Sequence, residues 1–317
     1  MMEFGAKPIT RGLAVAFTAL CLSAAPALAD VLLITNAPDS RLLQVSDDGS
    51  AVTTLAGPAN GLADPTSMAY DGAGNLFIAS QDNKTIYKRA PDGTMAIYAS
   101  GLTTLRNMTV SPTGEVYMTE TLSGTSIQRV NPDGSLTTFA AGSGASEVIF
   151  DSSGTLIYTS GLKVYTHDLG TDTSTEFADL TATAIAGAIN GLALDAAGNL
   201  YGSLNFTNKV VEIGFDGTVA DFITANLDRP SGILFEDSGT VLVTNFVVSG
   251  DVNRYAADGT FVETLISGLL QPKSVVTAQG APVVTPEPPE PVPEPATLFI
   301  LGAGLAAGLR FRRKAKG

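Results

Sequence analysis

The sequence has few of the residues on which disulfide-bonded proteins and histidine-dependent enzymes rely. Its 317 residues include one cysteine, one histidine and no tryptophan, and aromatic residues make up 7%. Cys21 lies in the predicted leader segment described below, so the mature chain has no cysteine with which to form a disulfide. A Ser-His-Asp catalytic arrangement needs a histidine, and His167 is the one available.

Basic residues are also scarce in the long central part of the chain. Between Asp30 and Thr285 there are 11 lysines and arginines against 27 aspartates and glutamates, a net charge of −16. Such a charge repels phosphate backbones, and no basic stripe interleaved with aromatic residues occurs in this part. We therefore expect no nucleic-acid partner.

Helical periodicity is absent from the same region, and a repeat of short apolar runs takes its place. The stretch from Asp64 to Gly101 contains four such runs, namely Thr66 to Tyr70, Leu76 to Ser80, Thr85 to Arg89 and Thr94 to Ala99. Glycine-containing clusters separate the first from the second and the third from the fourth. Glycine readily adopts the positive φ of a tight hairpin turn, so the runs are predicted to be consecutive antiparallel strands.

The pattern recurs along the chain with a period typical of β-propeller blades. Turn glycines of the first kind are separated by 40 to 44 residues and fall at Gly74, Gly114, Gly154, Gly198 and Gly239. Asp-Gly turns of the second kind begin at Asp48, Asp92, Asp133, Asp216 and Asp258. In the fourth repeat, Asp168 to Asp172 stands in that place. Four strands in such a period predict one propeller blade.

The two ends of the repeat array predict the number of blades. Three strands precede the first complete unit, at Val31 to Asn36, Arg41 to Ser46 and Ala51 to Leu55, and one strand, Lys273 to Ala278, follows the last. Three strands and one strand make a blade, and a ring closed in this way has no open edge. The sequence therefore predicts an all-β fold, a six-bladed β-propeller over residues 30–280, closed by N- and C-terminal strands in one blade.

The N-terminal residues 1–29 have the features of a secretory signal peptide. Lys7 and Arg11 precede an apolar run of ten residues, Leu13 to Leu22, and Ala27 and Ala29 occupy the two positions that a signal peptidase reads. We expect cleavage before Asp30. The alternative, a permanent membrane anchor, is disfavoured because the run is too short to span a bilayer.

The C-terminal residues form a linker and a tail. Residues 281–295 are rich in proline and glutamate, and residues 296–317 contain an apolar run followed by five basic residues. Pro293, Glu294 and Pro295 with this tail resemble the PEP-CTERM sorting signal of Gram-negative bacteria. The resemblance implies export machinery and an exosortase as partners, transient anchoring in the inner membrane, and delivery to the cell envelope or outside, often in strains that make exopolysaccharide. A permanent single-pass anchor is the alternative.

The repeats resemble the NHL and senescence-marker-protein/gluconolactonase-like six-bladed propellers, most closely in the run from Asn190 to Tyr201. In the lactonases of that group a glutamate, two asparagines and an aspartate hold a divalent cation on the axis. Asn190 matches one asparagine, whereas Ser231 and Lys273 depart from the aspartate and glutamate. Streptogramin-lyase propellers, which the blades also resemble, use a histidine base. We expect His167, in a third strand away from the axis, to be a surface residue.

Aligning the blades on their turn glycines predicts a ring of residues at the start of the innermost strands: Thr66, Arg106, Ser146, Asn190, Ser231 and Lys273. We call these six the ring positions; Asn107 and Glu147 follow two of them. Two cations and no acid at the ring positions contrast with the acidic domain and favour a carboxylate, sulfate or phosphate ligand. The alternative is that both cations only bind loop carbonyls.

The predicted ligand-binding residues are therefore Arg106, Asn107, Glu147, Asn190, Ser231 and Lys273, with no catalytic residue, metal ligand or cofactor assigned. We expect an exported binding or scaffold protein, which contacts acidic polysaccharide or another surface protein. The alternative function is that of a metal-dependent lactonase or hydrolase, which would require a divalent cation.

Overall fold

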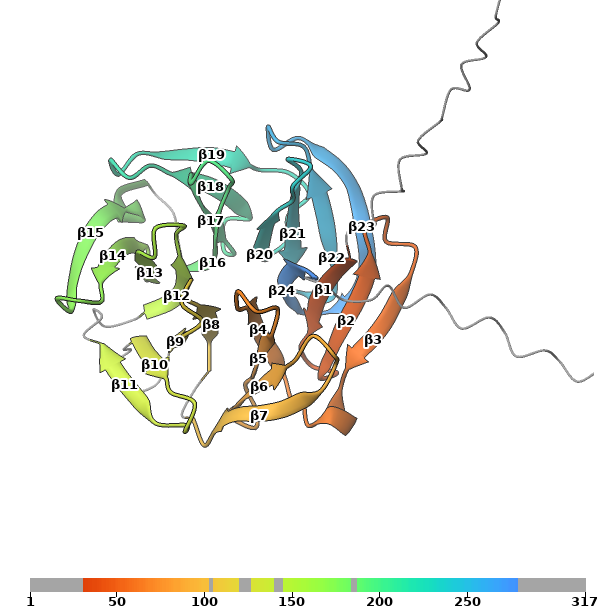
Figure 1. Cartoon of the computed structure of the whole chain (residues 1–317). Helices are drawn as coiled ribbons and strands as arrows, with labels where there is room; N and C mark the ends of the chain where they lie inside the picture. Colours follow the sequence, from red (N-terminus) through yellow and green to blue (C-terminus); the bar gives the residue numbers. More distant parts are fainter. Residues whose placement is uncertain (1–30, 103–104, 120–126, 140–144, 184–186, 279–317) are drawn as a thin grey trace, which may run out of the picture. The chain divides into compact units, whose positions relative to one another are not determined.

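The structure, a computed structural model, describes residues 31–102, 105–119, 127–139, 145–183 and 187–278. Within these residues 24 strands form six antiparallel sheets of four strands each, arranged as blades around a common axis (Figure 1). The predicted all-β six-bladed propeller is confirmed. The predicted signal peptide, linker and sorting tail lie outside the described residues.

Each blade runs from an innermost strand at the axis to an outermost strand at the rim. The innermost strands are β24 (Pro272–Thr277), β4 (Pro65–Tyr70), β8 (Asn107–Val110), β12 (Ala145–Phe150), β16 (Ile189–Leu194) and β20 (Pro230–Phe235). The second strands are β1 (Val31–Asn36), β5 (Leu76–Ser80), β9 (Val116–Thr119), β13 (Leu156–Ser160), β17 (Leu200–Leu204) and β21 (Val241–Asn245). We number the blades 1 to 6 in the order of these two series.

The third strands are β2 (Arg41–Ser46), β6 (Thr85–Arg89), β10 (Ile127–Val130), β14 (Lys163–Asp168), β18 (Lys209–Ile213) and β22 (Val248–Tyr255). The outermost strands are β3 (Val52–Ala56), β7 (Met95–Ser100), β11 (Leu136–Phe139), β15 (Thr173–Asp179), β19 (Val219–Ile223) and β23 (Phe261–Leu270). Two short 3₁₀ turns, η1 (Pro58–Asn60) and η2 (Leu180–Thr183), follow outermost strands.

The predicted turns account for the regularity of the blades. The glycines of both turn series have positive φ, between +69° and +90°, so each hairpin closes where the sequence placed it. In blade 4 the carboxylate of Asp168 accepts hydrogen bonds from the backbone N–H groups of Gly170 and Thr171, and this turn replaces the Asp-Gly pair. The aspartates of the Asp-Gly turns cap the backbone in a similar way, as Asp92 does by accepting from the N–H of Thr94, so blade 4 keeps the cap and lacks only the glycine next to the aspartate.

Blade 1 joins the two ends of the described chain. Strand β1 pairs antiparallel with β24, with Leu33 opposite Val276 and Ile34 opposite Val275. Beside this pairing, the amide oxygen of Asn36 accepts the backbone N–H of Leu270 at 2.6 Å. The predicted closure by a terminal strand is confirmed, and it leaves the β1 edge covered.

A charged cluster reinforces the contact between blades 6 and 1. Arg254 of β22 binds Glu236 at 3.1 Å and Glu263 at 2.8 Å in its own blade, and Asp47 at 2.5 Å in blade 1. The side chains of Arg254 and Glu236 are only 12% and 6% exposed. This cluster therefore crosses the interface at which the chain closes on itself.

The core lies between the blades rather than in one central mass. Phe77 and Ile86 of blade 2 pack with Val116 and Met118 of blade 3, and equivalent apolar clusters fill the neighbouring interfaces. Both faces of the inner part of a blade are covered by its neighbours, so the second strands carry near-continuous buried runs, whereas the outermost strands are largely exposed. The innermost strands contact one another in ring order around the axis.

Buried hydroxyl groups fix the spacing of adjacent innermost strands. Thr119 donates to the carbonyl oxygen of Ser146 at 2.9 Å, and Ser203 donates to that of Ser231 at 2.7 Å. Ser67 donates to the carbonyl oxygen of Met108 at 3.1 Å. Each bond links the backbone of one blade's innermost strand to a side chain of the preceding blade, and so positions the ring residues around the axis.

Candidate functional site

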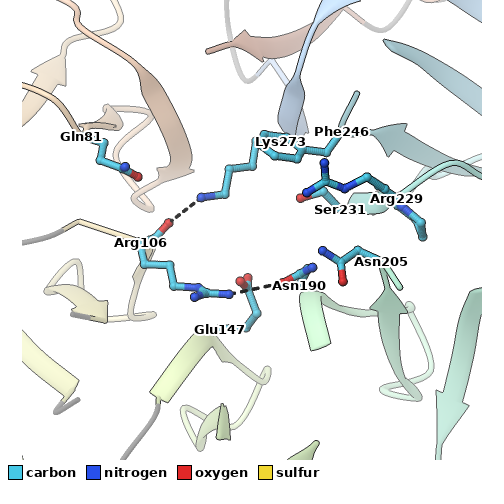
Figure 2. A pocket seen from close by; sticks show the side chains of 10 residues that line it. Gln81, Arg106, Glu147, Asn190, Asn205, Arg229, Ser231, Phe246 and Lys273 are labelled. Carbon is cyan, nitrogen blue, oxygen red and sulfur yellow. Dashed lines mark hydrogen bonds between the residues drawn. The ribbon is translucent and has the colours of Figure 1, made fainter. Parts of the chain in front are cut away.

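A cavity of about 300 Å³ opens on the axis at the start of the innermost strands (Figure 2). Four of the six ring positions line it, namely Arg106, Asn190, Ser231 and Lys273, and Glu147 lines it too. A second cavity of about 160 Å³ continues along the innermost strands, and its lining includes Thr66, Asn107 and Glu147. The structure thus brings together five of the six predicted ligand-binding residues in the first cavity and places Asn107 in the second.

The two cations of the ring are held across the axis by neighbours in other blades. A terminal nitrogen of Arg106 donates to the amide oxygen of Asn190 at 3.2 Å, and the ammonium of Lys273 donates to the carbonyl oxygen of Arg106 at 3.2 Å. The alternative that these basic side chains bind loop carbonyls is therefore met in part, because one N–H of the Lys273 ammonium binds such a carbonyl. An ammonium has three donors and a guanidinium five, so both groups retain donors for a ligand.

Glu147, predicted to bind ligand one residue after a ring position, brings an acid into the cavity that the six ring positions lack. The ring position before it, Ser146, turns its hydroxyl away from the axis to contact Thr159 at 2.8 Å, while Glu147 takes the axial place. A register shift between Ala145 and Val148 spans both residues, which changes their orientation relative to a regular strand. The cavity thus contains one acid, the predicted ligand-binding residue Glu147, beside its basic side chains.

The environment of Glu147 favours its neutral form. The side chain is buried, and one carboxylate oxygen accepts a hydrogen bond from the amide of Asn107 at 2.7 Å. Burial raises the pKa of Glu147 to about 8, although Lys273 and Arg106 both act to lower it. Burial also lowers the pKa of Lys273, opposed by Glu147 and Asp64. At neutral pH the cavity therefore has a net positive charge.

Five residues of the first cavity were not predicted from the sequence: Gln81, Asn205, Arg229, Pro230 and Phe246. Three of them, Gln81, Asn205 and Phe246, are each the first residue after the second strand of a blade. The position after each second strand recurs with the same repeat period as the ring positions, so the period is the sequence signal for these three residues. Arg229 immediately precedes β20, as Arg106 precedes β8, and Pro230 is the first residue of β20.

The loops of blades 5 and 6 form the outer side of the cavity. The guanidinium of Arg229 lies over the ring of Phe246, 5.6 Å from its centroid, in the geometry of a cation–π contact. The amide oxygen of Asn205 is buried and has no hydrogen-bond partner among the described residues. A buried acceptor without a donor destabilises the folded protein, because it has lost its hydrogen bonds to water. This side of the cavity thus offers an aromatic face and an acceptor.

The donor set does not fit a divalent cation. Hard cations need several oxygen ligands, but the amide oxygen of Asn190 already accepts from Arg106, and the cavity contains the ammonium of Lys273. Within the described ranges, no group of three or more histidine, cysteine, aspartate or glutamate side chains is placed to hold a metal ion. Glu147, Asn190 and Asn205 line the cavity beside Arg106 and Lys273, whose positive charges oppose a bound cation.

His167 lies outside the axial site, in the third strand of blade 4 as predicted, but it is not a surface residue. Its side chain is buried, with the ring edge-on to Phe139 of blade 3 at 5.8 Å and one nitrogen 2.9 Å from the hydroxyl of Ser174. Burial lowers the pKa of His167. The surface prediction failed because neighbouring blades cover third strands as well as inner ones.

Comparison with protein families matches residues 291–314 to the PEP-CTERM protein-sorting motif. The chain carries a PEP-CTERM sorting motif. The match contains Pro293, Glu294 and Pro295 and confirms the predicted signal. The motif indicates a secreted protein with a C-terminal membrane-anchor signal and implies recognition by exosortase-type export machinery. In the part of the chain that the structure describes, no helix is long and apolar enough to cross a membrane.

The fold of this chain is similar to that of several solved structures. A chain of a nidogen/laminin complex matches with a TM-score of 0.66 and 14% identity, covering 80% of this chain and 99% of that one. Virginiamycin B lyase from Staphylococcus aureus matches with a TM-score of 0.56 and 18% identity, covering 74% of this chain and 80% of that one. A gluconolactonase from Xanthomonas campestris matches with a TM-score of 0.57 and 15% identity, covering 78% of this chain and 89% of that one. Comparison with curated proteins gives no match. At these identities the similarities show the fold alone.

Proposed function

We propose that this exported propeller is a binding protein whose axial cavity holds an anionic group of an extracellular ligand, and that the ligand is an acidic polysaccharide. The observation that carries the proposal is the distribution of charge. Three of the 11 basic residues between Asp30 and Thr285, namely Arg106, Arg229 and Lys273, line one small cavity, whereas one of the 27 acidic residues does. Charge-assisted hydrogen bonds from these groups favour an anion.

The sorting motif supports the location of such a ligand. Export followed by tail removal would bring the propeller to the cell envelope or the medium of a Gram-negative bacterium, after transient anchoring in the inner membrane. Acidic exopolysaccharide is available there, and its hydroxyl groups suit the amide side chains of the cavity. A surface protein with an exposed carboxylate is the alternative partner of the same site.

Titration of the exported protein with acidic and neutral oligosaccharides tests the proposal. We expect acidic oligosaccharides to bind, neutral counterparts to bind at least tenfold more weakly, and affinity to fall as salt rises from low to physiological concentration. Arg106→Ala and Lys273→Ala should each weaken binding at least tenfold. Equal affinity for both classes of sugar, or a stoichiometric divalent ion in the purified protein, would contradict the proposal.

A further inference from the structure

The axial cavity has two chemically different sides, and both constrain the ligand. On one side lie Arg106, Lys273 and Glu147 from the innermost strands; on the other lie Asn205 and Phe246 from loops of blades 5 and 6 (Figure 2). An inorganic anion would use only the first side. A ligand that uses both must carry a negative group attached to a body with an apolar face and a hydrogen-bond donor.

We infer that the cavity recognises a single terminal hexuronate residue, with its carboxylate between Arg106 and Lys273 and its pyranose ring against Phe246; this inference rests on the proposed function. A pyranose presents a face of C–H groups that packs on an aromatic ring. The side chain of Asn205 lines the same cavity, and after a rotation of this side chain its amide oxygen, which lacks a partner among the described residues, accepts from a ring hydroxyl. One molecule thereby satisfies the cations, the aromatic face and the acceptor.

The charge of the site favours a monoanion. Burial disfavours the charged forms of both Glu147 and Lys273, so the positive charge of the buried part of the site is modest. The exposed Arg229 adds a more weakly interacting charge. A carboxylate matches the planar fork of a guanidinium and the modest positive charge better than a phosphate monoester, which carries up to two negative charges.

The size and position of the cavity favour the end of a chain over its middle. A volume of about 300 Å³ lies at the low end of ligand pockets, which span roughly 300 to 1,000 Å³, so one sugar residue fills it. Below the ring residues the axis narrows to the second cavity, of about 160 Å³. A polysaccharide therefore enters from the loop side and ends at the ring.

Isothermal titration of the exported protein with defined sugars tests the inference. The probes are galacturonate, glucuronate and mannuronate, the neutral sugar galactose, galactose 6-sulfate and inorganic sulfate. We expect at least one hexuronate to bind at least tenfold more tightly than galactose, galactose 6-sulfate and sulfate. Tri-uronates of the preferred sugar should bind with one site per propeller.

The variants separate the two sides of the cavity. Phe246→Ala and Asn205→Ala should weaken hexuronate binding at least fivefold and leave weak sulfate binding unchanged. Phe246→Tyr, which keeps an aromatic face, should retain affinity. Phe206→Ala is the matched control, because Phe206 adjoins Asn205, is 70% exposed and does not line the cavity. Thermal melting confirms that each variant is folded.

Two results would overturn the inference. If sulfated sugars or sulfate bind as well as hexuronates, or if Phe246→Ala and Asn205→Ala have no more effect than Phe206→Ala, the uronate assignment fails. Acidic polysaccharide binding that still depends on Arg106 and Lys273 would leave the proposed function intact in that case. Failure of every acidic ligand to bind would overturn both.

Discussion

Removing the Arg254 side chain should measure how strongly blades 6 and 1 are held together. Arg254 and Glu236 are 12% and 6% exposed, and truncating one partner of a buried ion pair typically costs about 3 to 5 kcal/mol. Asp47 and Glu263 are 45% and 48% exposed, so their contacts add at most about 1 kcal/mol each. Since Arg254 itself is partly solvated, we expect Arg254→Ala to lower the free energy of unfolding by about 3 kcal/mol. For a domain of this size that lowers Tm by roughly 6 to 12 °C.

Urea unfolding and calorimetry of the exported protein provide the measurement. The matched control is Lys209→Ala, which removes a surface ion pair with Asp221 at 2.6 Å within blade 5 and should cost less than about 1 kcal/mol. Arg254→Lys should lie between the two because an ammonium cannot reproduce the planar fork. If Arg254→Ala and Lys209→Ala unfold at the same urea concentration, the cluster does not stabilise the closure and the reasoning fails.

Three further predictions concern the site, the frame and processing. Ionisation of Glu147 cancels a positive charge of the cavity, so hexuronate affinity should fall as pH rises through about 8 in the wild type. In Glu147→Gln the fall should move to lower pH, because Lys273, whose pKa burial lowers, loses the acid that opposes this shift; titration calorimetry at several pH values checks both. Ser203→Ala leaves the carbonyl of Ser231 without its donor and should cost about 1 to 2 kcal/mol in urea unfolding, and no loss would argue against the hydroxyl contact. Intact mass spectrometry of exported protein should find a chain from near Asp30 to about Pro295, whereas a retained C-terminal basic tail would indicate a permanent anchor.

The repeat made the fold predictable from the sequence. Turn glycines with positive φ set the hairpins, and a hairpin order repeated six times leaves little choice of topology. The strand bounds at the closure differ by one residue from those expected: the last strand is Pro272–Thr277, where Lys273 to Ala278 was predicted. The repeat period and the turn residues are local properties of the sequence, so they can be recognised without knowledge of tertiary contacts.

The site was predictable only where it follows the same period. Arg106, Asn190, Ser231 and Lys273 meet on the axis because equivalent positions of a closed ring must converge. Glu147 lines the cavity in place of Ser146, and the register shift of β12 does not account for this because β4, β16 and β20 have a comparable shift.

The remaining errors come from packing between blades. The burial of His167 against Phe139 depends on how two blades pack, and the position of Phe246 beside Arg229 depends on loop conformation. These are contacts between segments that are distant in the sequence, so a reading of strand periodicity does not capture them.

The hydroxyl contacts between neighbouring blades use backbone atoms of the innermost strands, whereas the ligand cavity is lined by side chains of the same strands. The spacing of the blades at Ser231 is held through its backbone carbonyl by Ser203, while its side chain faces the cavity. Substitutions of that side chain therefore leave the contact between blades in place. Such a division allows evolution to change ligand preference by single exchanges at the axis, and it makes the ring a suitable position for grafting new recognition chemistry onto an unchanged scaffold.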